Sequence, residues 1–120
     1  MHEFPRVLSA TTLIGDKVIN SHGEELGDVK ELMIDLDEGR VAYAVLSFGG
    51  LMGVGNKLFA IPWEALDLDT EKHAFVLNVD KEVLDNAPGF DKDNWPDNGQ
   101  YAMDWLRDVY EHYKVTPYWR

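Results

Sequence analysis

The chain has 120 residues and no cysteine, and its 22 acidic and 11 basic side chains give a formal net charge of −11. This length suits one domain, and 45% hydrophobic residues argue against disorder. The negative charge disfavours binding to nucleic-acid phosphates or anionic lipid, which leaves a basic protein partner or simple solubility as interpretations. The lack of cysteine excludes disulfides, thiolate metal sites and thiol nucleophiles.

The N-terminus lacks the features of a targeting segment. It carries the acidic Glu3 and no sustained apolar core, unlike a secretory signal. Elsewhere no apolar run approaches the roughly 20 residues needed to span a bilayer. We therefore expect a cytoplasmic protein with no membrane insertion, and the absence of cysteine fits a reducing compartment.

The first third of the chain predicts a lead-in followed by a hairpin. Residues 1–12 show no periodic apolar pattern and are expected to form a loose N-terminal lead-in. Strand signals begin at Leu13, and residues 21–24 are typical of a hairpin turn in which Gly23 takes a positive φ. The following strand, residues 25–37, changes the parity of its apolar positions between Val29 and Leu32, which predicts a bulge.

The central stretch, residues 41–66, predicts two strands, a glycine-rich loop between them and a Pro-Trp corner. The strand over residues 41–48 is apolar on both faces and should therefore be covered on both. The loop over residues 49–56 holds four glycines together with three apolar residues that are unfavourable in water. Those residues, Leu51, Met52 and Val54, should fold back on the core or meet another surface.

The last part predicts a hairpin and two helices. Residues 66–79 form the hairpin, and Asp80 is a candidate N-cap for a short helix that ends before residues 86–90. After a polar linker at residues 91–98, residues 99–113 predict an amphipathic helix with a strongly aromatic face. That face must be covered by its own barrel or by a neighbouring molecule.

These elements predict a mainly β fold. About six short strands joined by tight turns are typical of a small closed or nearly closed barrel, here with a short helix and a C-terminal amphipathic helix. The expected organisation is a lead-in at 1–12, a barrel domain at 13–90, and a linker with the aromatic helix at 91–120.

From Leu13 to Val79 the sequence resembles the PRC-barrel family. Single residues carry part of the resemblance: Gly15, Gly23 and Gly27 in the first hairpin, then Asp35, and Gly39 in the following turn. The segment 43–50 and the sequence Ala60-Ile61-Pro62-Trp63 carry the rest. The family includes the cytoplasmic domain of the photosynthetic reaction centre H subunit and the C-terminal domain of ribosome maturation factor RimM. The resemblance implies a small, strongly bent β-barrel used for binding and scaffolding, with no shared catalytic set. The H subunit's membrane helix and RimM's RNA-contacting domain are absent here, so a stand-alone, soluble member is expected.

The sequence offers few ligands for metals, phosphates or catalysis. Carboxylates two residues apart, such as Asp35 and Asp37 or Asp67 and Asp69, could hold a hard cation, but solvated turn carboxylates are the preferred interpretation. The four histidines lack metal spacing and belong to no catalytic triad pattern. The glycine loop lacks a phosphate-binding pattern. No catalytic, cofactor-binding or metal residue is therefore predicted, and an enzyme is not expected.

Two functions remain. The first is a non-enzymatic protein-interaction or adaptor module whose partner is a protein, with a homodimer expected. The second is a small-ligand carrier or sensor with a pocket between barrel and C-terminal helix. The candidate interaction surface combines the apolar loop with exposed aromatic residues: Leu51, Met52, Val54, Trp63, Tyr101, Trp105, Tyr113 and Trp119.

Overall fold

The fold is mainly β, as the sequence predicts. The computed structural model describes residues 6–48, 57–87, 89–90 and 100–119, apart from the side chains at 81, 85 and 100–102. The strands are β1 (Lys17–Ile19), β2 (Glu25–Asp35), β3 (Arg40–Phe48), β4 (Lys57–Pro62), β5 (Leu66–Asp69), β6 (Ala74–Leu77) and β7 (Gly89–Phe90). The helices are α1 (Ala10–Leu13), the 3₁₀ turn η2 (Trp63–Ala65), α2 (Lys81–Asp85) and α3 (Gln100–His112).

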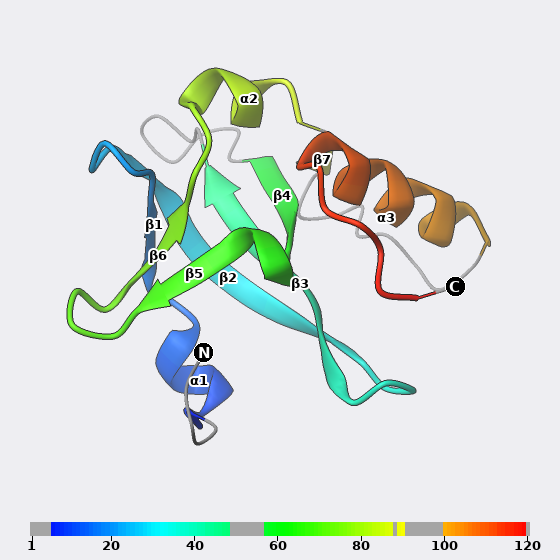
Figure 1. Cartoon of the computed structure of the whole chain (residues 1–120), viewed down its shortest axis with the longest axis horizontal. Helices are drawn as coiled ribbons and strands as arrows, with labels where there is room; N and C mark the ends of the chain where they lie inside the picture. The colour runs from blue at the N-terminus through cyan, green and yellow to red at the C-terminus, as the bar shows by residue number, and fades with distance from the viewer. Residues whose placement is uncertain (1–5, 49–56, 88, 91–99, 120) are drawn as a thin grey trace.

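One bent sheet contains all of the described strands, in the order β5-β6-β1-β2-β3-β4-β7 (Figure 1). Neighbouring strands run antiparallel except β1 and β6, which are parallel. Within the described residues no hydrogen-bonded ladder joins the edge strands β5 and β7, so closure of the barrel stays a prediction. The described residues form seven strands rather than about six, because the two-residue β7 adds to the edge of β4.

The β2–β3 hairpin forms the long central arm of the sheet. Its register shifts between Val29 and Glu31, which confirms the bulge expected there, and again between Met33 and Ile34. Gly39 takes a φ of 65° in the connecting turn. Bulges strengthen the local twist of a strand pair, so these two shifts help to bend the sheet.

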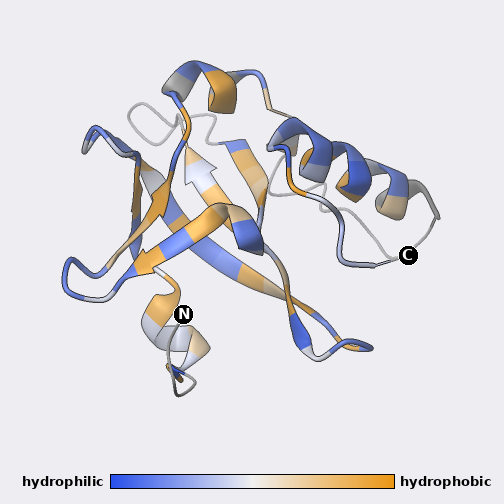
Figure 2. Ribbon diagram, in the orientation of Figure 1, coloured by the Kyte–Doolittle hydropathy of each residue, from blue (hydrophilic) through white to orange (hydrophobic). Residues whose placement is uncertain are grey.

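The core lies around β3. Ala42 to Leu46 are all buried, so both faces of this strand are covered, as its two-sided apolar pattern predicts. On one side β3 pairs with β2 and on the other with β4, where Val45 lies opposite Ala60. Figure 2 shows the hydrophobic residues concentrated along β4 and β6.

The N-terminal region differs from its expectation. Residues 10–13 form a helical turn, whereas a loose lead-in with strand structure from Leu13 was expected. Ser9 caps the turn, because its Oγ accepts a hydrogen bond from the Thr12 N–H at 3.2 Å. Leu13 then buries its side chain in the core, a tertiary contact that local sequence does not reveal.

The C-terminal helix α3 covers one side of the sheet beside β4 and β7 (Figure 1). Leu106, Val109, Tyr110 and Tyr113 join the same hydrophobic core as the strands. The observed bounds, 100–112, lie within one residue of the expected helix. None of the helices in the described part of the chain has the length and apolar content needed to cross a membrane.

Candidate functional site

The aromatic face of α3 packs on this chain's own sheet. The Trp105 ring meets the ring of Tyr43 edge to face at 5.9 Å and that of Phe90 at 5.8 Å. Tyr110 is fully buried, and its hydroxyl donates to the carbonyl oxygen of Ala42 at 2.5 Å. Of the two arrangements that the sequence left open, these contacts show the helix covering its own barrel.

The residues that follow α3 are anchored to the β2–β3 hairpin through a polar and aromatic network. The Tyr118 hydroxyl donates to Asp35 Oδ2 at 2.6 Å, which links the tail to the end of β2. The guanidinium of Arg40 lies 3.8 Å from the centre of the Tyr118 ring and also pairs with Glu64 in η2. The ring of Trp119 packs on Tyr110 at 4.8 Å.

The electrostatics of this network favour a fixed structure over proton transfer. Burial raises the pKa of the Tyr118 phenol, and its hydrogen bond to Asp35 raises it further. The same hydrogen bond lowers the pKa of Asp35 below its ordinary value of 3.8. At neutral pH the phenol is therefore protonated and the carboxylate ionised. A general acid or base needs a pKa near the working pH, and neither group has one.

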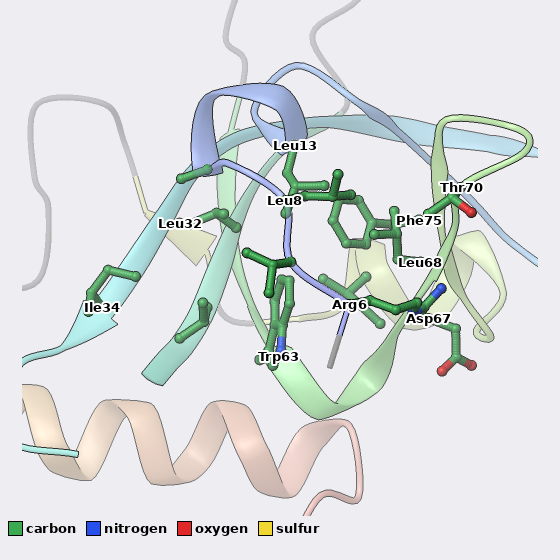
Figure 3. Close-up of a pocket in the computed structure, with 14 residues that line it drawn as sticks. Arg6, Leu8, Leu13, Leu32, Ile34, Trp63, Asp67, Leu68, Thr70 and Phe75 are labelled. Carbon is green, nitrogen blue, oxygen red and sulfur yellow. The ribbon is translucent and has the colours of Figure 1, made fainter. Parts of the chain in front are cut away.

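A second feature is an open pocket of about 670 Å³ between the N-terminal segment and the sheet. We call it the apolar groove. Figure 3 shows Asp67 and Thr70 at one end and Ile34 at the other, with Leu8 and Trp63 between them. The lining residues are Arg6, Val7, Leu8, Ala10, Leu13, Leu32, Ile34, Val41, Trp63, Leu66, Asp67, Leu68, Thr70 and Phe75.

Large apolar side chains extend from the groove into solvent. Leu8 and Ile34 line the groove yet remain 48% and 51% exposed, and Val7 is 84% exposed. Leu36, in the turn just beyond Ile34, is 90% exposed. Ile34 and Leu36 both belong to the stretch 25–37 that the sequence predicts as one strand, whereas β2 ends at Asp35. The end of the hairpin extends past the core, and sequence periodicity carries no signal for that.

A smaller pocket of about 360 Å³ lies where α2 approaches the end of α3. Its lining mixes apolar residues such as Val79 with the polar residues His22, Asp80, His112 and Lys114. The imidazole Nε2 of His112 lies 2.9 Å from the carbonyl oxygen of Val83, so this ring joins α3 to α2. Among the described residues no three histidine or carboxylate side chains gather in a way that could hold a metal ion.

The predicted interaction surface divides into three groups. Leu51, Met52 and Val54, together with the side chain of Tyr101, lie outside the described residues. Trp63 is half-buried, lines the apolar groove and packs edge to face on Phe75 at 5.8 Å.

The remaining three, Trp105, Tyr113 and Trp119, pack within the chain. Trp119 Nε1 and the Tyr113 hydroxyl are buried and find no hydrogen-bond partner among the described residues. The four residues with described side chains therefore do not share one exposed surface. Of those with described side chains, only Trp63 lies at the groove.

The fold and site define a small β domain with an open apolar groove and a C-terminal tail bonded to the β2–β3 hairpin. A family model for the PRC-barrel domain matches residues 5–84, more than half of the chain. The chain belongs to the PRC-barrel family. No protein in a search of curated sequences matches it. The family match ends at Leu84, so α3 and the tail lie beyond the matched region.

Proposed function

We propose that this chain is a non-enzymatic protein-interaction module of the adaptor type, and that it binds its partner at the apolar groove. One observation carries the proposal: Val7, Leu8 and Ile34 are large apolar side chains that line the groove and yet remain exposed. Burying such surface is favourable at roughly 25 cal/mol per Å², so a partner that covers it gains binding energy. Clustered exposed apolar residues commonly mark interaction sites.

The structural setting of the groove supports this proposal. Its floor contains Leu13, Leu66 and Phe75, which belong to the buried core and hold the walls in place. A preformed site loses little conformational entropy on binding. The proposed binding surface therefore differs from the candidate surface drawn from the sequence. The aromatic face of α3 packs against the sheet of the same chain, and Trp63 is the residue that the groove shares with that candidate surface.

A display selection with random peptides tests this function. We expect the full chain to select binding peptides, and the double variant Leu8→Ser, Ile34→Ser to lose them. Met103→Ser is the matched control, because Met103 is an exposed apolar residue on α3, away from the groove. Recovery of no peptides, or peptides that bind the double variant as well as the native chain, would overturn the proposal.

A second candidate, a carrier or sensor for a small apolar ligand, is favoured by the dimensions of the groove. Its volume of about 670 Å³ lies within the range usual for ligand pockets. The ligand site would then lie between the N-terminal segment and the sheet, and none of the described side chains of α3 lines it. Native mass spectrometry of the chain purified from its own organism tests this candidate. A co-purifying small molecule that the Leu8→Ser, Ile34→Ser variant lacks would support it.

The proposed location of the chain is the cytoplasm.

A second copy of the chain is one candidate for the protein partner. Two copies would each carry a formal charge of −11, so repulsion opposes a dimer at low ionic strength. Sedimentation at low and high salt decides the point. A dimer that forms only at high salt would fit an apolar contact between like-charged copies.

A further inference from the structure

We propose that the segment bound by the apolar groove is basic as well as apolar. It would seat aliphatic or aromatic side chains in the groove and place lysine or arginine beside an acidic rim formed by Asp67, Asp69 and Glu71. This inference rests on the proposed interaction function and adds the chemistry of the partner.

The rim and the groove are continuous. A second shallow pocket of about 460 Å³ lies over the β5–β6 hairpin and is lined by Arg6, Asp67, Leu68, Asp69, Thr70, Glu71 and Val76. Four of these residues, Arg6, Asp67, Leu68 and Thr70, also line the apolar groove. A bound segment that leaves the groove at this end must therefore pass the rim.

The rim carries negative charge that no ion pair in the described part of the chain neutralises. Within the described residues, Asp67, Asp69 and Glu71 form no ion pair. Asp69 Oδ1 accepts the N–H groups of Glu71 and Lys72, each at 3.1 Å, so this carboxylate also fixes the turn. Of the described residues that line this pocket, Arg6 is the one cation, against three carboxylates.

Charge complementarity selects among the possible occupants. Nucleic acid and anionic lipid would bring negative charge to an acidic rim on a chain of net charge −11. A second copy would bring the same acidic surface to its own counterpart. A polypeptide segment with alternating or neighbouring apolar and basic residues satisfies both parts of the site, and its approach would be accelerated by the field of the whole molecule.

Three labelled peptides of equal length test the inference. In the first leucine alternates with lysine, in the second with glutamine and in the third with glutamate. Fluorescence anisotropy at low salt with the full chain should rank the lysine peptide tightest and the glutamate peptide weakest. Replacing Asp67→Asn and Glu71→Gln together should weaken the lysine peptide about fivefold and leave the glutamine peptide nearly unchanged. Added salt should reduce the difference between the lysine and glutamine peptides.

The control removes the same charge elsewhere. Asp108→Asn with Glu111→Gln changes two exposed carboxylates of α3 and should leave the ranking and the affinities almost unchanged. A glutamine peptide that binds the groove as tightly as the lysine peptide would overturn the basic preference while leaving the interaction function intact. If the α3 variant loses the preference for the lysine peptide just as the rim variant does, the preference comes from net charge alone. That result would also overturn the inference. If the Leu8→Ser, Ile34→Ser variant binds all three peptides as the native chain does, the proposed function itself fails.

Discussion

Asp35 acts at two places through its two carboxylate oxygens. Oδ1 accepts the N–H groups of Asp37 and Glu38 at 3.0 and 3.1 Å, which shapes the turn between β2 and β3. Oδ2 accepts the Tyr118 hydroxyl and so holds the C-terminal tail. One side chain therefore couples the conformation of a hairpin turn to the position of residues more than eighty positions later.

The first prediction concerns that pair. In Tyr118→Phe the hydrogen bond is lost while the ring can remain beside Arg40. The pKa of Asp35 should then rise toward its ordinary value of 3.8, because the Tyr118 hydroxyl is the largest cause of its depression. An NMR titration of the side-chain carboxyl carbon measures this pKa. A titration curve identical to that of the native chain would mean that the tail is not held there in solution.

Gly27 is required by the close approach of two strands. A Cβ built at this position would lie 2.1 Å from the backbone oxygen of Ser47 on β3, and the residue has a φ of 152°. Both features disfavour a side chain at this position. The Ser47 oxygen belongs to the backbone and cannot rotate away, and residues with a Cβ rarely adopt this positive φ. In the sequence Gly27 is one of the features that carry the family resemblance, and the structure shows the strand contact that requires glycine there.

The second prediction follows from that contact. Gly27→Ala should lower the free energy of unfolding by about 3 kcal/mol, combining backbone strain with displacement of β3. Gly23→Ala is the matched comparison, because Gly23 also has a positive φ, 81°, but has open space around it. That variant should lose only about 1 kcal/mol. Urea unfolding measures both, and equal losses would contradict the role given to the strand contact.

At the scale of elements, α3 belongs to the same folding unit as the sheet even though it lies beyond the family match. The third prediction compares two positions on this helix. Leu106→Ala should cost about 3 kcal/mol of unfolding free energy, because Leu106 is buried against the sheet. Met103→Ala, at a position 38% exposed, should cost less than about 1 kcal/mol.

Urea unfolding with circular dichroism measures both α3 variants. If Leu106→Ala unfolds like Met103→Ala, the helix does not stay on its own sheet in solution. The aromatic face of α3 would then again be free to pair with another molecule, as one of the two sequence-based alternatives holds.

Sequence reasoning recovered those elements whose signals are local. Turn chemistry located the bend at Gly23, and the parity change after Val29 located a bulge that the structure confirms. The two-sided apolar pattern of β3 predicted its burial correctly. The family resemblance, read from dispersed glycines and one Pro-Trp phrase, is confirmed by the family model.

The groove could not be predicted because it depends on how distant segments meet. Leu8, Ile34 and Asp67 come from three separate parts of the chain, and none carries a motif. Ile34 has the apolar character of a core residue, and only the projection of the hairpin beyond the core exposes it. The attachment of the tail through Tyr118 likewise needs a bent sheet and a docked helix before it can exist.

At the scale of the whole molecule, buried phenols make stability sensitive to alkaline pH. Burial is the largest cause that raises the pKa of Tyr43, Tyr110, Tyr113 and Tyr118 above the ordinary value of 10.0. These phenols bind their protons more tightly in the folded chain than in the unfolded chain. Their contribution to stability is therefore complete below the unfolded-state pKa and is lost as the pH rises above it.

The fourth prediction is that the free energy of unfolding falls between about pH 9 and about pH 11. Tyrosinate absorbance should rise at higher pH in the native chain than in urea, and its rise should coincide with loss of tertiary structure. Tyr110→Phe serves as the internal comparison, because Tyr110 is fully buried and hydrogen-bonded to Ala42. This variant should lose stability at neutral pH and show a shallower alkaline decline, since one of the phenols that link proton binding to folding is gone. Native and denatured titration curves that coincide would show that the rings are open to solvent, and the packing of α3 and the tail would have to be abandoned with them.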